Sequence, residues 1–176
     1  MKTDQQILKQ NLRRVAEQML LAARTAPKAR GKDNLYAAIL SKDEIDHLAR
    51  IMIQTGKEKK LHFFQRDGHN LEQTDTAILL GTSIEPMDLP HCGFCGYAHC
   101  DEKREHPDTP CAFNTGDLGI ALGSAVSVAM NHRADNRIMF TAGKAALQAG
   151  ILPDDIKIAY VVPLSGGSKN PYFDRK

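Results

Sequence analysis

Residues 114–132, with the sequence NTGDLGIALGSAVSVAMNH, are dominated by small residues. Gly119, Gly123 and Ser127 recur four residues apart, so a helix over this stretch presents them on one face that carries almost no side chain. A neighbouring backbone or a flat ligand can approach such a face closely. The spacing alone therefore predicts either tight packing of two helices on this face or contact with a ligand.

Two earlier helices are indicated by residue pairs with the spacing of a capping box, in which the two residues at the start of a helix satisfy each other's backbone groups. Apolar residues follow each pair at helical period, which predicts one buried face. The pairs are Thr3 with Gln6 and Ser41 with Glu44, and we expect helices over residues 3–24 and 41–56, with Gly56 ending the second.

Short apolar runs alternate with these helices and predict strands. We expect strands over residues 35–40, 76–81 and 156–162, with a helical turn as the alternative for the first. We also expect a short helix over residues 70–73, and a helix from Asp135 through Ala149 that Gly150 and Pro153 end. Asp117 and Asp135 are interpreted as residues at helix ends. Helices that alternate with a few strands predict an α/β or an α+β fold, of which we favour α+β. No linker divides the chain, so residues 1–176 are predicted to form a single domain.

The charge and hydropathy of the chain argue against nucleic acid and membranes as its binding partners. The formal net charge is +2, which provides no large electrostatic field for nucleic acid or for an anionic membrane. No window has about 18 consecutive apolar residues, and the beginning of the chain lacks a secretory signal. We therefore expect a cytoplasmic protein, and stable disulfides are rare in that compartment.

All four cysteines lie in one short window, as Cys92-x2-Cys95-x4-Cys100 followed after ten residues by Cys111. Four thiolates suit either tetrahedral zinc or an iron–sulfur cluster. Zinc sites usually use two short-spaced pairs, and only one such pair is present here. Three close ligands with a more distant fourth favour a four-iron four-sulfur (4Fe–4S) cluster over residues 91–111, with zinc as the alternative metal.

Glycines and histidines accompany the cysteines. Gly93 and Gly96 directly follow the first two cysteines, and glycine lets backbone amides turn towards cluster sulfurs. His91, His99 and His106 are close enough in sequence to replace a ligand. With four thiolates available, we interpret these histidines as supporting or exposed groups rather than ligands.

The segment CGFCGYAHC resembles the CGxCGxxxC signature of the iron–sulfur domain in the Rnf electron-transport complex and in corrinoid iron–sulfur proteins. That resemblance covers only Cys92, Cys95, Cys100 and Cys111. Nearly the whole chain resembles a family of uncharacterised bacterial and archaeal proteins that contain a ferredoxin domain. The stretches that carry this second resemblance are AARTAPKARG, HCGFCGYAHC, CAFNTGDLGIALGSAVSVA, DNRIMFTAGKAA and VPLSGGSKNPYFDR.

A weaker similarity, to flavin-dependent nitroreductases, is carried by AARTAPKARGKDN (residues 22–34) and DLGIALGSAVSVAMNH (residues 117–132). It implies a three-layer core of sheet and helices, with FMN at a homodimer interface. The cysteine-rich metal-binding loop, which has no counterpart in ordinary nitroreductases, is an addition to that core. The similarity also implies that Arg24, Lys28 and Arg30 bind the flavin phosphate.

These observations predict an iron–sulfur electron-transfer protein, and the nitroreductase similarity implies an FMN-dependent oxidoreductase. The substrate and the redox partner, whether a protein or a small molecule, are not indicated by the residues. Two alternatives stay open: a zinc-stapled binding module, and a sensor that responds to loss of its cluster.

Overall fold

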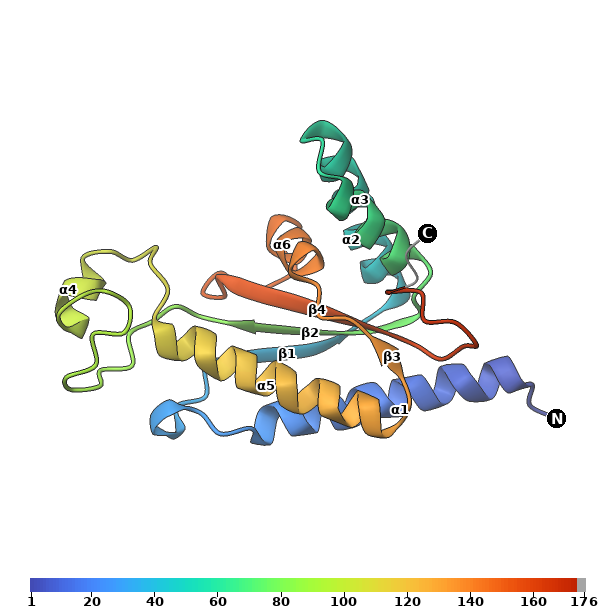
Figure 1. Ribbon diagram of the computed structural model, residues 1–176, viewed down its shortest axis with the longest axis horizontal. Coiled ribbons are helices and arrows are strands. Elements are labelled where there is room, and N and C mark those ends of the chain that lie inside the picture. Colours follow the sequence, from blue (N-terminus) through green and yellow to red (C-terminus); the bar gives the residue numbers. More distant parts are fainter. Residues whose placement is uncertain (174–176) are drawn as a thin grey trace.

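A computed structural model describes residues 1–173, in which one sheet lies between two layers of helices (Figure 1). In chain order the elements are α1 (Asp4–Thr25), a 3-10 turn η1 (Ala29–Gly31), β1 (Leu35–Leu40), α2 (Lys42–Glu58), α3 (His62–Glu72), β2 (Thr76–Thr82), α4 (Cys100–Arg104), α5 (Ala112–Asn131), β3 (Asp135–Asn136), α6 (Phe140–Gln148) and β4 (Ile158–Ser165).

The sheet is antiparallel and has the strand order β1-β2-β4-β3. The central strand β2 pairs with β1 on one side and with β4 on the other, and every one of its residues is buried. A continuous apolar run is the pattern expected of a strand covered on both faces. The strands expected at residues 35–40 and 76–81 are confirmed, and the third, β4, begins and ends slightly later than predicted.

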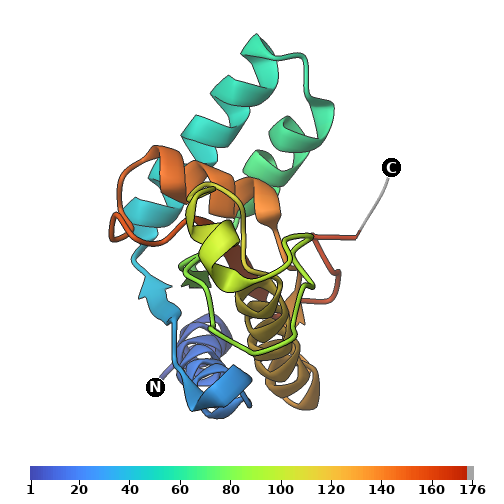
Figure 2. The same cartoon turned by 90° about the vertical axis from the view of Figure 1, so that its left-hand side faces the viewer.

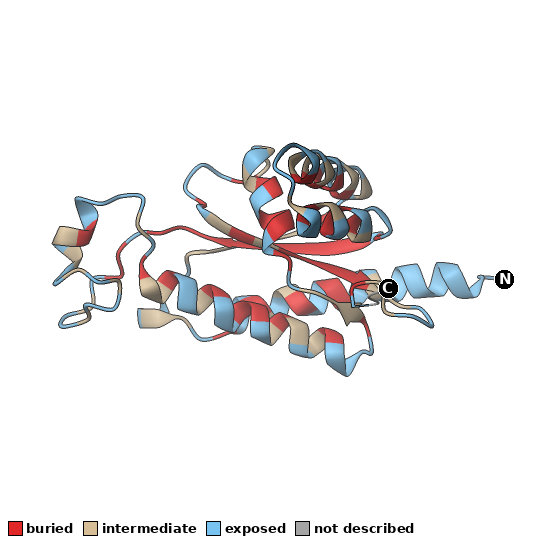
Figure 3. Ribbon diagram, turned by 45° about the horizontal axis from the view of Figure 1, so that its top comes forward, coloured by how far each residue is buried: buried red, intermediate tan, exposed pale blue. Residues whose placement is uncertain are grey.

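Two separate apolar cores lie on the two faces of the sheet. Ala77 and Leu79 of β2 pack with α2, α3 and α6, while Ile78 and Leu80 pack with α1 and α5. Successive strand residues point to opposite faces, so one apolar strand supplies both cores. Figure 3 shows the buried sheet between the two helical layers. The predicted α+β fold with a three-layer core is confirmed.

The two capping boxes form as predicted. The side chains of Thr3 and Ser41 accept hydrogen bonds from the backbone N–H groups of Gln6 and Glu44, respectively. In return, the side chains of Gln6 and Glu44 accept the backbone N–H groups of Thr3 and Ser41. The prediction that Gly56 ends the second helix is wrong, because α2 continues to Glu58. Gly56 is instead a contact point for α3: a Cβ there would lie 2.6 Å from Cγ of Gln65.

Two further helix predictions are corrected. The short helix expected over residues 70–73 is the end of α3, which begins at His62. Asp135 does not begin a helix: it lies in β3 opposite Ser165, and α6 begins only at Phe140. The start of α6 has no side-chain cap, so the sequence carries no local signal for it.

Gly143 determines how closely α6 lies on the sheet. A Cβ at this position would be 1.8 Å from the carbonyl oxygen of Ala159 in β4, so only glycine permits this approach. The mixed α+β single domain is thus seen across the described residues. Its extension over residues 1–176 stays a prediction, because residues 174–176 of the tail lie outside the part that the structure describes.

Candidate functional site

The cysteine-rich segment connects β2 to α5 and projects from one end of the three layers (Figure 1). Figure 2 views this end directly and shows α4 with its flanking loops in front of the beginning of α5. Cys100 is the first residue of α4, and Cys111 immediately precedes α5. The segment therefore places three cysteines in a projecting loop and the fourth at the start of a core helix.

Left-handed backbone conformations shape the loop. Gly93 and Gly96 have φ angles of 64° and 91°, and the N–H of Gly96 donates to the carbonyl of Gly93 at 3.0 Å. These conformations are strained for residues that carry a Cβ. The glycines next to Cys92 and Cys95 thus make the tight turn that the first two cysteines need.

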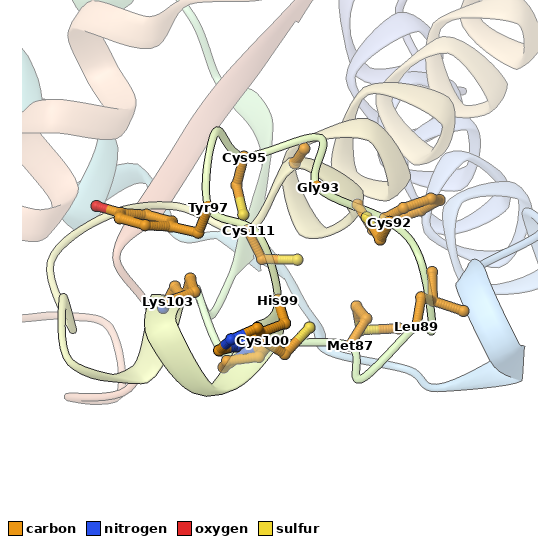
Figure 4. A pocket seen from close by; sticks show the side chains of 13 residues that line it. Met87, Leu89, Cys92, Gly93, Cys95, Tyr97, His99, Cys100, Lys103 and Cys111 are labelled. Carbon is orange, nitrogen blue, oxygen red and sulfur yellow. The ribbon is translucent and has the colours of Figure 1, made fainter.

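All four cysteines line one pocket of about 380 Å³ that is open to solvent. Cys111 is buried, the other three are partly exposed, and none of them forms a disulfide. In Figure 4 the sulfurs of Cys95, Cys100 and Cys111 face a common space, with Cys92 on the far side of it. All four predicted metal ligands therefore line the same pocket, and their binding of a metal stays a prediction.

The donor set fits a thiolate-bound iron–sulfur cluster, since four thiols line the pocket and no carboxylate does. Four thiols also satisfy zinc. Within residues 1–173, no three side chains of the metal-binding types converge closely enough to hold a single ion.

The histidines of the segment have other contacts. The Nδ1 atom of His99 accepts from the N–H of Glu102 at the start of α4, at 3.2 Å. His106 stacks on Tyr97 with ring centroids 4.8 Å apart, and both His99 and His106 are exposed. The interpretation of these groups as supporting rather than ligating residues stays a prediction.

Several residues that the sequence analysis did not single out tie the segment to the body of the protein. The buried amide of Asn114 donates to the carbonyls of Ser83 and Glu85, at 3.1 and 2.7 Å. The Lys103 ammonium donates to the carbonyl of Ile84 at 2.8 Å. These contacts join the start of α5 and α4 to the chain that leaves β2, and no local sequence pattern announces them.

The three cations predicted to bind a phosphate all lie in or beside the loop between α1 and β1. Arg24 forms an ion pair with Asp33 at 2.7 Å. Burial raises the pKa of the Asp33 carboxyl. The hydrogen bonds from Arg24 and from the backbone N–H of Leu35, together with the charges of Arg24 and Lys28, outweigh burial, so the pKa is lowered overall.

Lys28 and Arg30 contact only neutral acceptors among the described residues. The Lys28 ammonium donates to three carbonyls at the end of α1, the closest being that of Arg24 at 2.7 Å. Arg30 donates to the carbonyls of Met87 and Asp88, which links this loop to the cysteine segment. Because carbonyls do not neutralise a cation, both side chains keep a charge that suits a phosphate. Their role stays a prediction.

Asp117 holds the same loop in place. It was predicted to be a helix-end residue, but it lies in the second turn of α5, where both carboxylate oxygens accept the N–H of Ala29, at 3.1 and 3.0 Å. A contact between residues so distant in sequence has no local signature.

A second hollow, of about 700 Å³ and open to solvent, lies beside the cysteine pocket. Phe94, from between two cysteines, stacks on Phe113 of α5 with centroids 5.7 Å apart and planes 7° apart. Ala112 and Phe113 line both the hollow and the cysteine pocket. Lys28 also lines the hollow, so the predicted phosphate loop and the predicted cluster loop meet there.

The small-residue face of α5 is exposed. A Cβ added to Gly116, Gly119 or Gly123 would meet no atom within 4 Å. The opposite side of α5, which includes Leu118 and Ala125, packs against α1. The alternative in which two helices of this chain pack on the glycine face is therefore wrong for the described residues.

Comparisons with known proteins show a family to which the chain is similar. The family profile described as "Uncharacterized protein containing a ferredoxin domain (DUF2148)" matches residues 108–175, which include Cys111. An uncharacterized protein of Archaeoglobus fulgidus is 35% identical over 164 residues, which cover 89% of this chain and 88% of that protein.

Solved structures with a similar fold include FMN proteins and nitroreductases. A nitroreductase family protein from Clostridium novyi NT matches with a TM-score of 0.59 at 14% identity, over 86% of this chain and 73% of that one. An FMN-dependent nitroreductase from Clostridium difficile R20291 matches with a TM-score of 0.54 at 16% identity, over 92% and 80%. Identities this low show a shared fold, which is the nitroreductase fold.

None of the helices within residues 1–173 combines the length and the hydropathy that crossing a bilayer requires.

Proposed function

This chain belongs to the family of uncharacterized proteins that contain a ferredoxin domain, and on that premise we propose that it is an iron–sulfur oxidoreductase. In this proposal Cys92, Cys95, Cys100 and Cys111 bind a 4Fe–4S cluster, and FMN occupies the neighbouring hollow. Bound flavin would exchange electrons in pairs and the cluster would pass them singly, to or from a redox partner or a small molecule.

One observation carries the proposal: all four cysteines line a pocket that shares Ala112 and Phe113 with an open hollow. A cofactor in the pocket and a cofactor in the hollow would both contact the first turn of α5. Such close placement favours electron transfer between them over two independent functions.

The residues around the hollow suit the two parts of a flavin nucleotide. Phe94, Phe113 and Ile120 offer apolar surface for a flat ring system. Lys28 stands at the rim with a charge that no described carboxylate neutralises directly, and Arg30 carries a second one in the same loop. We propose that these two residues, with Arg24 beside them, hold the flavin phosphate.

We further propose that the protein is a homodimer joined through the exposed face of α5. Gly119 and Gly123 leave room for a second backbone to approach, and the exposed Ile120 and Met130 lie on the same helix. Since a homodimer of this kind would cover the hollow at Gly116, it would also exclude water from the proposed flavin site. The free thiols suit a reducing compartment, and we propose the cytoplasm.

Single variants purified without oxygen test the cluster assignment. Cys100→Ser and Cys111→Ser should lose the visible absorption and most of the iron of the wild type. His106→Ala is the matched control, because it removes a ring beside the segment that does not line the pocket, and it should keep both. Full iron and sulfide in Cys100→Ser would contradict the assignment.

The flavin assignment is tested separately through Gly116, which lines the hollow and has open space around it. Gly116→Leu should fill the hollow without disturbing the single chain, so flavin released by denaturation should fall sharply. Gly116→Ala, a much smaller change, should retain most of the flavin. If the wild type binds no flavin under saturating FMN, the flavin assignment is overturned, and an iron-loaded protein is then an electron carrier or a sensor without flavin chemistry.

A further inference from the structure

Lys103 is the one buried lysine among those within residues 1–173. Only 3% of it is exposed, and it belongs to α4, the short helix that begins at Cys100. The next residue, Arg104, is exposed and forms ion pairs with Asp88 and Asp101. Lys103 is thus buried while its neighbour Arg104 is exposed, and of the two only Arg104 has carboxylate partners within residues 1–173.

The Lys103 ammonium has a single described partner, the carbonyl oxygen of Ile84 at 2.8 Å. None of the ion pairs found within residues 1–173 includes it. An ammonium group has three N–H donors, and burying its charge without a counter-charge is costly. The environment of Lys103 therefore lacks an anion.

Lys42 is a lysine of the same protein whose ammonium has both carbonyl acceptors and a carboxylate partner. Its ammonium also donates to backbone carbonyls, those of Glu72 and Thr74, at 2.8 and 3.1 Å. In addition it pairs with the carboxylate of Asp46 at 2.8 Å. Both lysines bridge a helix to a neighbouring segment, but within residues 1–173 only Lys42 has a carboxylate counter-ion.

The pocket of the four cysteines could hold the anion that Lys103 lacks, because Lys103 is one of the residues that line it. Figure 4 places it across the pocket from Cys92. Lys103 is the only lysine or arginine among the described residues that line this pocket, and no carboxylate is among them. A thiolate-bound cluster is anionic, and reduction makes it more so.

We propose that Lys103 is the counter-charge of the cluster and raises its reduction potential, an inference that rests on the proposed iron–sulfur function. A fixed positive charge stabilises the reduced cluster more than the oxidised one, and the effect is strong where water is excluded. Lys103 is a positioning residue as well, because its bond to Ile84 fixes α4, and with it Cys100, against the chain that leaves β2.

The experiment compares midpoint potentials in redox titrations followed by electron paramagnetic resonance, with iron and sulfide measured on each sample. Lys103→Gln removes the charge and keeps an N–H donor for Ile84, whereas Lys103→Arg keeps the charge. Lys42→Gln is the matched control, since it removes a lysine with the same kind of carbonyl contacts far from the cysteines in the chain. We expect a more negative potential in Lys103→Gln alone.

The outcomes separate this inference from the function on which it rests. Wild-type protein without iron overturns both. If wild type and Lys103→Gln both contain iron and have the same midpoint potential, only the proposed role of Lys103 is overturned. If Lys103→Gln loses its iron, retention of iron by Lys103→Arg supports the counter-charge. If both variants lose iron equally while circular dichroism shows an intact fold, the counter-charge is contradicted and Lys103 has a purely steric role.

Discussion

Asp117 of α5 accepts the backbone N–H of Ala29 with both carboxylate oxygens, at 3.1 and 3.0 Å. This contact fixes the loop that carries Lys28 and Arg30 against the helix that begins at the cysteine pocket. The loop and the helix are thus held together, although they are far apart in the chain.

Removing this contact should loosen the loop. We expect Asp117→Ala to lower the free energy of unfolding by about 1–2 kcal/mol, because the Ala29 N–H loses a charged acceptor. Asp117→Asn keeps one acceptor oxygen and should lose less. Urea unfolding gives both values, and Asp108→Ala, at an exposed site, is the control. Equal stability of wild type and Asp117→Ala would show that the loop does not depend on α5.

The close approach of α6 to the sheet gives a sharper test of the fold. In Gly143→Ala the new methyl group would lie 1.8 Å from the carbonyl oxygen of Ala159, which belongs to the backbone of a central strand. We expect a loss of more than about 3 kcal/mol, or no soluble protein. Gly116→Ala, with open space around it, should be neutral or slightly stabilising by helix propensity. A stable Gly143→Ala variant would show that α6 is placed wrongly.

The exposed glycine face makes the proposed homodimer testable. Gly123→Glu introduces a charge where the single chain has no neighbouring atom within 4 Å, so the fold should survive. A second copy on this face would meet the charge directly, and sedimentation should report a monomer. Gln148→Glu adds the same charge to α6 and should leave the dimer intact. A dimer that persists in Gly123→Glu must use another surface.

The second capping box has a definite dependence on pH. The hydroxyl of Ser41, and then its backbone N–H, lower the pKa of Glu44 from its ordinary value of 4.5. A lowered pKa means that Glu44 stabilises the fold above pH 4.5, and that this contribution disappears as the pH falls through the lowered value. Because the site is exposed, we expect about 0.5 kcal/mol or less.

Unfolding of wild type and Glu44→Gln, measured at several pH values, checks this sign. The wild type should be the more stable protein at neutral pH, and the difference should vanish in acid. A difference that grows as the pH falls would contradict the assigned hydrogen bonds.

Local rules predicted the elements whose signals are local. The pairs Thr3–Gln6 and Ser41–Glu44 form their capping boxes, and the apolar run at residues 76–81 is the buried central strand. Where a helix begins without a side-chain cap, as α3 and α6 do, the sequence misled us. Asp135 has the residue type of a cap, but pairing with β4 placed it in a strand instead.

The residues of the candidate site likewise include some that local sequence patterns mark and some that they do not. Four cysteines at short spacing are conspicuous, and the structure gathers them at one pocket. Lys103, Asp117 and the stacked pair Phe94–Phe113 depend on contacts between distant segments, and nothing in their own neighbourhoods in the sequence marks them. Their importance follows from burial and partners, which only the fold determines.

Metal, sulfide and flavin analysis of wild-type protein purified without oxygen tests most directly whether the four cysteines hold an iron–sulfur cluster. We predict about four irons and about four sulfides per chain, with visible absorption that dithionite bleaches. A colourless protein with about one zinc per chain would contradict the cluster and make the cysteines a structural zinc site.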